Sequence, residues 1–362
     1  MIAFASFCGS VAIFLKLQKR NVLRLPIQSE DETVEVKQIF GRALLTLTAF
    51  AAVMLAYISF QYKIGEMGSP SGTALPFRIK GLIFYARIIC VPLILLFSIY
   101  LLDRSDDFRW SRVGIMILLL NGIVDMFLRN SRSSLLLALL LIGFLIFVNG
   151  VRLRHKEKVF LGAVALFALF MVPIMTEYRH MRTALKLSQF NAILAVFEHT
   201  GGNWIQQLAD AIKFVLFRMP GIESLWCQLA LGARPLGLHS FEIIRSTNGI
   251  AGYLTFAIHP MKLGDNTLLA PGFVGWLYMV GGAPIIILGS SIIGFITVYI
   301  WKLLAVIFTN SYVIAKVFLL WMLFIALTEG TLDSMGLMIT AGITTIIFVE
   351  VLVRRLFRIV VI

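Results

Sequence analysis

Charged residues are scarce in this sequence of 362 residues. Only 14% of the residues are Asp, Glu, Lys or Arg, whereas 59% are hydrophobic. A soluble protein of this composition would carry more apolar surface than its core could bury. A lipid bilayer removes the difficulty, because apolar side chains can face hydrocarbon there instead of water. The composition therefore argues against an ordinary soluble protein and predicts an all-α membrane protein.

Cysteine is rare as well, and Cys8, Cys90 and Cys227 show no Cys-x-x-Cys spacing. This pattern supports neither a disulfide framework nor a zinc site. The sequence also lacks a glycine-rich phosphate loop with its lysine, a Gly-x-Ser-x-Gly motif and a His-Glu-x-x-His motif. We therefore expect no cofactor and no bound metal.

The net charge of +13 raises the possibility of a nucleic-acid partner. Most Lys and Arg residues, however, stand beside long apolar runs, and they form no stripe interleaved with aromatic residues that could stack bases. Basic residues beside membrane spans set the orientation of the chain. We therefore expect no nucleic-acid partner.

The apolar runs predict about nine membrane-spanning helices. They cover residues 1–15, 39–60, 81–102, 113–128, 135–148, 159–176, 271–301, 313–328 and 335–353. The first run lacks the basic start of a signal peptide, so it is either a short span or the remainder of a longer N-terminus. We predict three regions: N-terminal spans over 1–176, a long polar loop with amphipathic helices over 177–270, and C-terminal spans over 271–362.

The distribution of basic residues predicts the orientation of these spans. Alternate assignment of the loops places 17 Lys and Arg on one side and five in the short loops opposite. The 17 are Lys16, Lys19, Arg20, Arg24, Lys37, Arg42, Arg104, Arg109, Arg112, Arg152, Arg154, Lys156, Lys158, Lys302, Arg354, Arg355 and Arg358, and the five are Lys63, Arg78, Lys80, Arg129 and Arg132. The richer side should be cytoplasmic. This predicts an external N-terminus, a cytoplasmic C-terminus and an external long loop.

The run 271–301 is too long for one ordinary span, because about 20 residues cross the hydrocarbon core. Gly281, Gly282 and Pro284 mark the expected break, since glycine adopts unusual backbone angles and proline removes a helix donor. A broken helix at membrane depth is tolerated where it is buried in protein or lines a wet cavity. The alternative is a helix lying on the membrane surface from Leu268, followed by a normal span from Pro284.

The segment Arg129–Ser134 is a polar turn between two apolar runs. These runs contain 16 and 14 residues, and they would cover only about 21 to 24 Å of a hydrocarbon core about 30 Å thick. We therefore expect Arg129 and Arg132 to be drawn toward the hydrocarbon edge, where two guanidiniums could bind a lipid diphosphate. The alternative is that both side chains extend to ordinary lipid headgroups.

The predicted external segment, residues 177–265, is rich in groups that could bind a diphosphate or accept a proton. From it we select Arg218, Arg234 and Arg245 as further diphosphate ligands, and Glu223, His259 and Asp265 as candidate bases. Charges are common in any water-facing loop, so each residue alone is a weak indication.

Other ionisable residues lie within or at the ends of predicted spans and are candidates for that reason alone: Asp125, Lys316, Glu329 and Asp333. Asp103, Asp106 and Asp107 could suggest a metal-bound nucleotide site. Their basic neighbours Arg104 and Arg109 favour solvated charge in a short turn instead.

Three stretches resemble the polysaccharide polymerases of bacterial surface-glycan assembly, a group that makes O-antigen and exopolysaccharide and is related to the O-antigen ligases. Residues 130–136, Asn-Ser-Arg-Ser-Ser-Leu-Leu, resemble the Ser-Arg step that opens a span in polymerases and ligases. Residues 217–225 are similar to an Arg and Glu stretch of the polymerases' large outer loop, and residues 270–282 to the segment that follows this loop into the membrane.

The resemblance implies a GT-C-like membrane glycosyltransferase that works without a metal. It would move a growing glycan from undecaprenyl diphosphate onto the next lipid-linked repeat unit, at the periplasmic face of the inner membrane. By matching positions, Arg132 and Arg218 would bind the diphosphate, and Glu223 would shape the site or act as base. Membrane lipids and a chain-length regulator are the further expected partners.

Two alternatives stay open. An O-antigen ligase should have a histidine followed by asparagine shortly before the segment that resembles residues 270–282, whereas His259 is followed by Pro260. A lipid-linked oligosaccharide flippase or exporter, a different class of protein, would also bind diphosphate with arginines. It should show internal repeats and polar groups at the membrane midplane.

Overall fold

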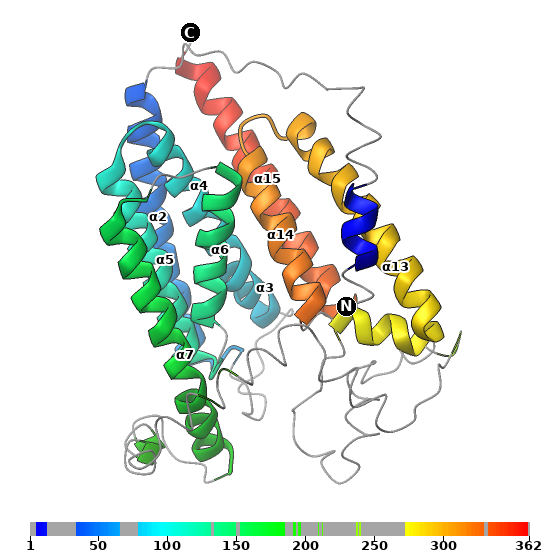
Figure 1. Cartoon of the computed structure of the whole chain (residues 1–362). Helices are drawn as coiled ribbons and strands as arrows, with labels where there is room; N and C mark the ends of the chain where they lie inside the picture. Colours follow the sequence, from blue (N-terminus) through cyan, green and yellow to red (C-terminus); the bar gives the residue numbers. More distant parts are fainter. Residues whose placement is uncertain are drawn as a thin grey trace. The chain divides into compact units, whose positions relative to one another are not determined.

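The computed structural model describes residues 5–12, 34–65, 79–131, 134–149, 153–184, 272–328 and 332–360, with a few isolated positions between 191 and 239. Residues 5–12 form a short helix. The other helices (Figure 1) are α2 (Val34–Gln61), α3 (Ile79–Tyr85), the π-helical turn η2 (Ala86–Cys90), α4 (Val91–Arg104), α5 (Phe108–Leu128), α6 (Ser134–Asn149), α7 (His155–Ala184), α13 (Gly272–Ile307), α14 (Tyr312–Thr328) and α15 (Leu332–Val360).

The described part of the chain is helical, as the composition predicted. Six of its helices are long and apolar enough to cross a membrane, and two shorter apolar helices cover Ser134–Asn149 and Tyr312–Ala326. Large apolar side chains such as Leu47, Leu82 and Phe147 are exposed on these helices, which suits contact with lipid. These features are those of a polytopic helical membrane protein. The number of nine spans stays a prediction.

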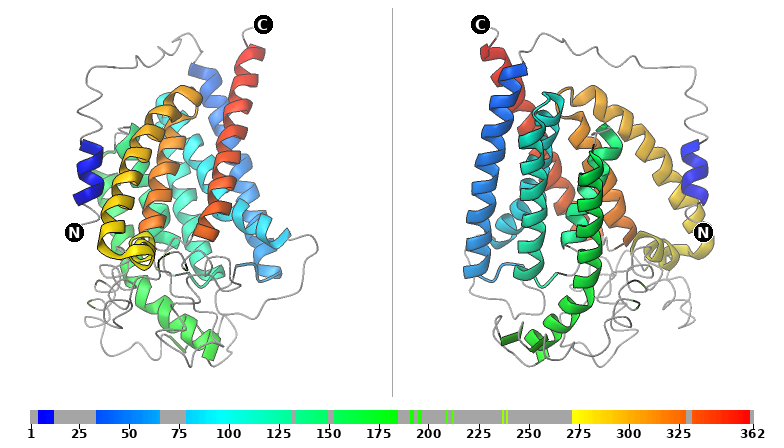
Figure 2. Two further views of the ribbon diagram at one scale, coloured as in Figure 1. Left: turned by 90° about the vertical axis from the view of Figure 1, so that its right-hand side faces the viewer. Right: turned by 60° about the vertical axis from the view of Figure 1, so that its left-hand side comes forward.

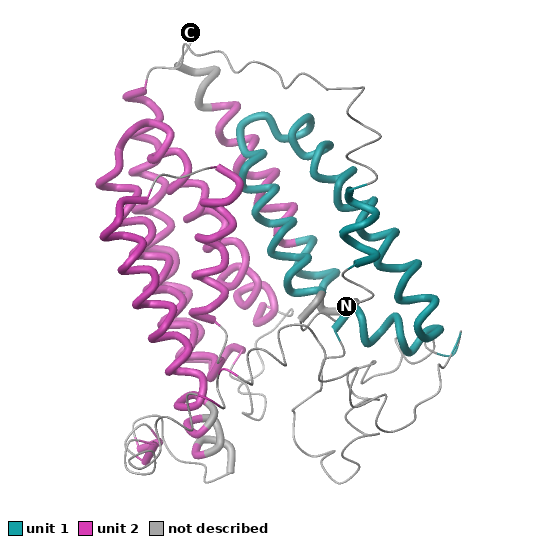
Figure 3. Tube along the Cα trace, in the orientation of Figure 1, with its two compact units in different colours: residues 1–28, 215–340 teal, residues 29–214, 341–362 magenta. Residues whose placement is uncertain are grey.

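The chain divides into two compact units (Figure 3). One contains residues 1–28 and 215–340, and the other contains residues 29–214 and 341–362. In this second unit α4 packs against α2, α5 and α6, and α6 also packs against α7. Eleven of the 14 residues of α4 are buried. A helix that is apolar on all sides is stable in this central place because its neighbours cover every face.

Helix α2 shows how the sequence selects the face that packs. Its buried residues are mostly small: Gly41, Leu45, Thr48, Ala52 and Ser59. Large residues such as Phe50, Val53 and Tyr57 are exposed on the other side. In lipid this distribution is favourable, because small residues let helices approach closely while hydrocarbon accepts the large apolar ones. The hydroxyl of Thr48 donates to the carbonyl of Leu44 at 2.7 Å, so it carries no unsatisfied donor into the interface.

The close contact between α5 and α6 depends on Gly122. A Cβ atom at this position would lie 2.9 Å from the Cβ of Ala138 and 3.3 Å from the Cα of Leu135. Real Cβ atoms need more space, so a larger residue would force the helices apart. Gly122 thus fixes how α6 lies along the last turns of α5.

Helix α13 is sharply bent in the other unit. Gly281 and Gly282 have non-helical backbone angles, and Gly282 has φ of 71° and ψ of −156°, a combination that essentially only glycine adopts. Leu277 lies against Gly289, where a Cβ would be 2.7 Å from its side chain. In a straight helix these residues would be about 18 Å apart along the axis. The break predicted at Gly281, Gly282 and Pro284 is confirmed, and the bent start of α13 is visible in Figure 2.

Proline enters this bend at a position that tolerates it. Pro284 comes directly after the two distorted glycines, at the beginning of the second part of α13. The first turn of a helix has no internal acceptors for its N–H groups, so the missing proline donor costs little there. The same three residues therefore end one helical piece and begin the next.

Candidate functional site

A buried ion pair joins η2 to α5. The guanidinium Nη2 of Arg87 contacts the carboxylate Oδ1 of Asp125, and the two side chains are only 2% and 7% exposed. Charged groups this deep in an apolar bundle are costly unless they are paired, and ionisable residues inside membrane spans are functional candidates by default. The Arg87–Asp125 pair is therefore the first element of the candidate site.

Local backbone geometry places Arg87 in this position. Arg87 belongs to the π-helical turn Ala86–Cys90, between α3 and α4. Such a turn inserts an extra residue into the helix and often occurs at functional sites. Within the described residues, Nε and Nη1 of Arg87 have no hydrogen-bond partner. Buried donors of this kind call for an explanation beyond stability.

The end of α5 is fixed by its backbone. Asn130 adopts a left-handed conformation with φ of 53°, which asparagine tolerates better than most residues. The N–H of Ser131 donates to the carbonyl of Met126 at 3.0 Å, and that of Asn130 to the carbonyl of Phe127 at 3.4 Å. These two bonds make a Schellman motif that ends the helix. Helix α5 therefore ends at Arg129, and the chain turns there, as the polar segment predicted.

Arg129 lies at this end, one helical turn after Asp125. Its guanidinium carbon is 5.0 Å from the centroid of the Phe84 ring in α3. A cation over an aromatic ring is attracted by its electron-rich face. Gly65, in the turn after α2, leaves room for both side chains, because a Cβ there would lie 2.7 Å from the Phe84 ring and 3.8 Å from Cγ of Arg129. The end of α5, the end of α3 and the turn after α2 thus meet around Arg129.

These residues form a group of charges that we call the Arg87–Asp125–Arg129 cluster. Within the described residues it contains two guanidiniums and one carboxylate. Asn130, Ser131 and Ser134 are buried beside it at the α5–α6 turn, with exposures of 2%, 3% and 6%. Guanidiniums with polar neighbours at the end of a helix are groups that can bind an anion.

The structure tests only part of the predicted site. Of the predicted ligands and bases, Arg129 is described and belongs to the cluster. The others lie outside the described residues, and their roles stay predictions: Arg132, Arg218, Arg234, Arg245, Glu223, His259 and Asp265.

The helix before Arg129 is longer than the apolar run of 16 residues that it contains. Helix α5 begins at Phe108 and has 21 residues, and its first five include Arg109 and Arg112. Such a helix covers about 32 Å, enough to cross the hydrocarbon core. The position of Arg129 relative to the hydrocarbon edge stays a prediction. Within the protein, the contact with Phe84 places its guanidinium.

The interpretation of Asp103, Asp106 and Asp107 as solvated charge was wrong in one respect. Asp106 is exposed, as expected for solvated charge, but Asp107 is only 9% exposed. The Nε of Arg42 in α2 donates to Oδ2 of Asp107 at 2.6 Å. Asp107 therefore joins α2 to the α4–α5 turn. Sequence reasoning had no access to this contact, because 65 residues separate the partners.

Of the remaining ionisable candidates, Lys316 has its amino group 5.0 Å from the ring centroid of Trp301 and 5.2 Å from that of Tyr312. These two aromatic faces stabilise the ammonium. Glu329 and the side chain of Asp333 lie outside what the structure describes. No group of three His, Cys, Asp or Glu close enough to hold a metal occurs within the described residues.

Arg87 was missed by the sequence argument, although a signal was present. It interrupts the apolar run 81–102, away from the polar loops that were used to assign orientation. A single arginine within a predicted span is itself a functional indication. Its partner could have been proposed, because Asp125 was the acidic residue within the predicted span 113–128.

Comparison of the chain with protein-family models, with curated proteins and with solved structures gives no match.

Proposed function

We propose that this protein is a membrane glycosyltransferase of the polysaccharide polymerase type. It transfers a growing glycan from undecaprenyl diphosphate onto a lipid-linked oligosaccharide repeat unit, at the periplasmic face of a bacterial inner membrane. The observation that carries the proposal is the Arg87–Asp125–Arg129 cluster at the end of α5. This is the end that the distribution of basic residues predicts to be external.

The cluster suits the chemistry of a diphosphate leaving group. In the transfer, the bond between the anomeric carbon and the diphosphate oxygen breaks, and the acceptor hydroxyl oxygen forms a bond to that carbon. The hydroxyl proton passes to a base, for which Glu223, His259 and Asp265 are the candidates. Negative charge develops on the diphosphate, and a fixed arginine lowers the energy of that state because its guanidinium is already in place.

Within this proposal Arg129 contacts the diphosphate and the Arg87–Asp125 pair positions it. Asp125 lies one helical turn from Arg129, and the N–H of Arg129 donates to the Asp125 carbonyl at 3.0 Å. Arg87 holds the Asp125 carboxylate in place, one helical turn before Arg129. The pair therefore anchors the last turn of α5, next to Arg129.

The test is incubation of the purified protein with a synthetic diphosphate-linked repeat unit, scored for a ladder of longer products. The wild-type protein should produce a ladder. Arg129→Ala should reduce the rate by about 10²-fold or more, as for loss of a donor to a developing negative charge, and Arg129→Lys should recover part of it. Arg109→Ala, at the opposite end of α5, is the control that removes the same charge and should keep the wild-type rate.

The products separate polymerase from ligase. A polymerase extends a lipid-linked acceptor by whole repeat units, whereas a ligase transfers the glycan once to a different acceptor. If the wild-type protein makes no product with any acceptor, the glycosyltransferase proposal is refuted. The role proposed for Arg129 is refuted if Arg129→Ala and Arg109→Ala are equally active.

A carrier of lipid-linked oligosaccharides is the second candidate, and two observations favour it. Helix α13 is broken at Gly281 and Gly282, and a charged pair is buried inside the bundle. Both features are common in membrane carriers, where broken helices and intramembrane charges line substrate pathways. Movement of a fluorescent diphosphate-linked lipid between the leaflets of proteoliposomes, without a new glycosidic bond, would favour the carrier.

A further inference from the structure

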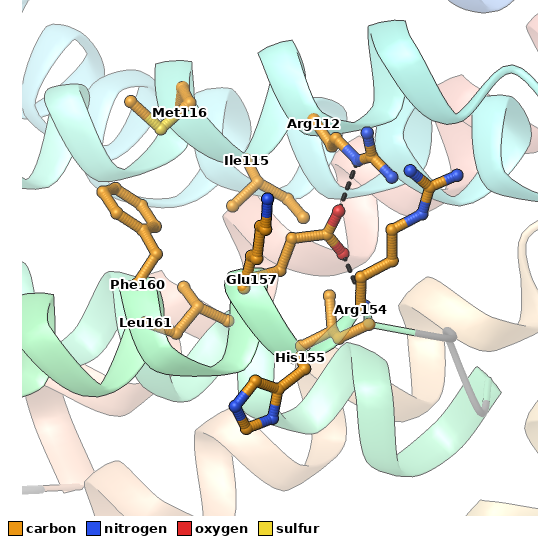
Figure 4. A pocket seen from close by; sticks show the side chains of 10 residues that line it. Arg112, Ile115, Met116, Arg154, His155, Glu157, Phe160 and Leu161 are labelled. Carbon is orange, nitrogen blue, oxygen red and sulfur yellow. Dashed lines mark hydrogen bonds and ion pairs between the residues drawn. The ribbon is translucent and has the colours of Figure 1, made fainter.

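A cavity of about 560 Å³ lies between the beginnings of α5 and α7, at the opposite end of α5 from Arg129. Its lining combines basic and apolar side chains (Figure 4). The residues are Arg112, Ile115 and Met116 from α5, with Leu153, Arg154, His155, Lys156, Glu157, Phe160 and Leu161 from the start of α7 and the two residues before it. This cavity has no part in the proposed transfer reaction.

The polar half of the cavity is positively charged. It contains Arg112, Arg154 and Lys156 against the single carboxylate of Glu157. Figure 4 shows the Glu157 carboxylate joined by dashed lines to Arg112 and to Arg154. The cavity also lies at the start of α7, where the positive end of the helix dipole adds to this charge. An anion is therefore the favoured ligand.

Glu157 organises the site and leaves cationic groups available. Its Oε1 forms an ion pair with Nε of Arg112 at 2.5 Å, and its Oε2 accepts a hydrogen bond from the backbone N–H of Arg154 at 2.9 Å. The second bond caps the start of α7 in the manner of a capping box. The two contacts hold Arg112 over the cavity, while the side chains of Arg154 and Lys156 are exposed.

The other half of the cavity is apolar and open to the surroundings. Met116 is 52% exposed and Phe160 is 41% exposed, and Ile115 and Leu161 line the cavity beside them. Both helices are apolar enough to cross a membrane. An apolar surface next to a cluster of cations suits a molecule that carries a phosphate at one end and acyl chains at the other. A free phosphate would use only the polar half.

We propose that this cavity binds one anionic phospholipid, with the headgroup phosphate on Arg112, Arg154 and Lys156 and an acyl chain along Met116 and Phe160. Basic cavities between membrane helices commonly bind such headgroups. The inference is independent of the proposed glycosyltransferase activity. It concerns the membrane surface at the basic end of the bundle.

The test is native mass spectrometry of the full-length protein in detergent, titrated separately with phosphatidylglycerol and with phosphatidylcholine of the same acyl chains. One phosphatidylglycerol should bind in preference to phosphatidylcholine. Lys156→Gln should lower this preference about fivefold, the effect expected for one surface charge. Lys158→Gln is the matched control, because Lys158 is exposed on the same helix and does not line the cavity.

A second variant, Glu157→Gln, should change the affinity for phosphatidylglycerol in the opposite direction from Lys156→Gln. The amide can still accept from the Arg154 N–H, so the cap is kept, while the charge that neutralises Arg112 is removed. Affinity for phosphatidylglycerol should rise. Glycerol 3-phosphate, which offers the phosphate without acyl chains, should not displace the lipid at equal concentration.

Three results would overturn the proposal. Equal binding of the two lipids would show that no anion site exists. Equal loss of preference in Lys156→Gln and Lys158→Gln would show that only general surface charge acts. Displacement by glycerol 3-phosphate would replace the lipid with a soluble phosphate ligand and contradict the role of the apolar half.

Discussion

Two arginine–carboxylate pairs stand near opposite ends of α5, and their surroundings differ sharply. Arg87 and Asp125 are 2% and 7% exposed, whereas Arg112 and Glu157 are 38% and 23% exposed. Both pairs join neighbouring helices of the same unit. The same chemical groups therefore occupy a dry interior in one case and an accessible surface in the other.

The difference shows what each pair can contribute. Removing two charges from water costs several kcal/mol for each ion, and mutual attraction only partly offsets this. The exposed pair keeps part of its hydration and gains little from association. The buried pair is therefore an expensive way to join two helices, which favours a role in positioning charge. The exposed pair can exchange its partner for a ligand at low cost.

The largest effect is expected for Asp125→Ala. Removal of the carboxylate leaves the guanidinium of Arg87 buried without a counterion. The free energy of unfolding should fall by about 3 to 5 kcal/mol. It can be measured by reversible unfolding in mixed detergent micelles.

The control for this prediction removes both charges together. Arg87→Met combined with Asp125→Leu should restore most of the lost stability, because apolar residues of similar size often replace a buried pair without cost. In the same double variant the ladder of glycan products should be lost if the pair positions Arg129. A double variant as unstable as Asp125→Ala would show that the pair itself holds the bundle together.

An intermediate effect is expected for Arg42→Met. Asp107 is 9% exposed and Arg42 is 43% exposed, so this pair lies between the two extremes. Methionine keeps an apolar stem but loses the bond to Asp107 and the cation 5.9 Å from the Trp110 ring. Unfolding free energy should fall by about 1 to 2 kcal/mol. The measurement is unfolding in the same micelles. If Arg42→Met lowers the unfolding free energy as much as Asp125→Ala does, the energy of these pairs does not depend on burial.

The smallest effect on stability is expected for Glu157→Gln. The ion pair with Arg112 is exposed, and the amide oxygen still caps α7. Unfolding free energy should change by less than about 1 kcal/mol. A loss several times larger would mean that the first turn of α7 depends on the charge of Glu157.

Local sequence predicted several features correctly, and each has a local cause. Gly281, Gly282 and Pro284 break α13 because their own backbone chemistry forbids a regular helix there. The polar turn predicted at Arg129–Ser134 does follow α5, which ends where Asn130 adopts a left-handed conformation. Apolar composition over a window of residues likewise indicated the long helices.

Features that join distant segments could not be predicted in this way. The contact of Arg87 with Asp125, the pairing of Arg42 with Asp107 and the cavity between α5 and α7 each bring together residues from separate helices. Helical periodicity indicates which positions share a face, but it does not indicate which helices become neighbours. Helix α5 begins at Phe108, before the predicted span 113–128. Its start follows Asp107, which pairs with Arg42 from a separate helix.

The sequence by itself therefore determined the class of protein, the approximate spans and the points where helices end or break, since these depend on composition and on the backbone preferences of single residues. Only the tertiary structure decided that Arg87 is buried against Asp125 and that Arg129 stacks on Phe84. The physical reason is that the energy of a charge depends on the groups around it, and helix packing supplies those groups.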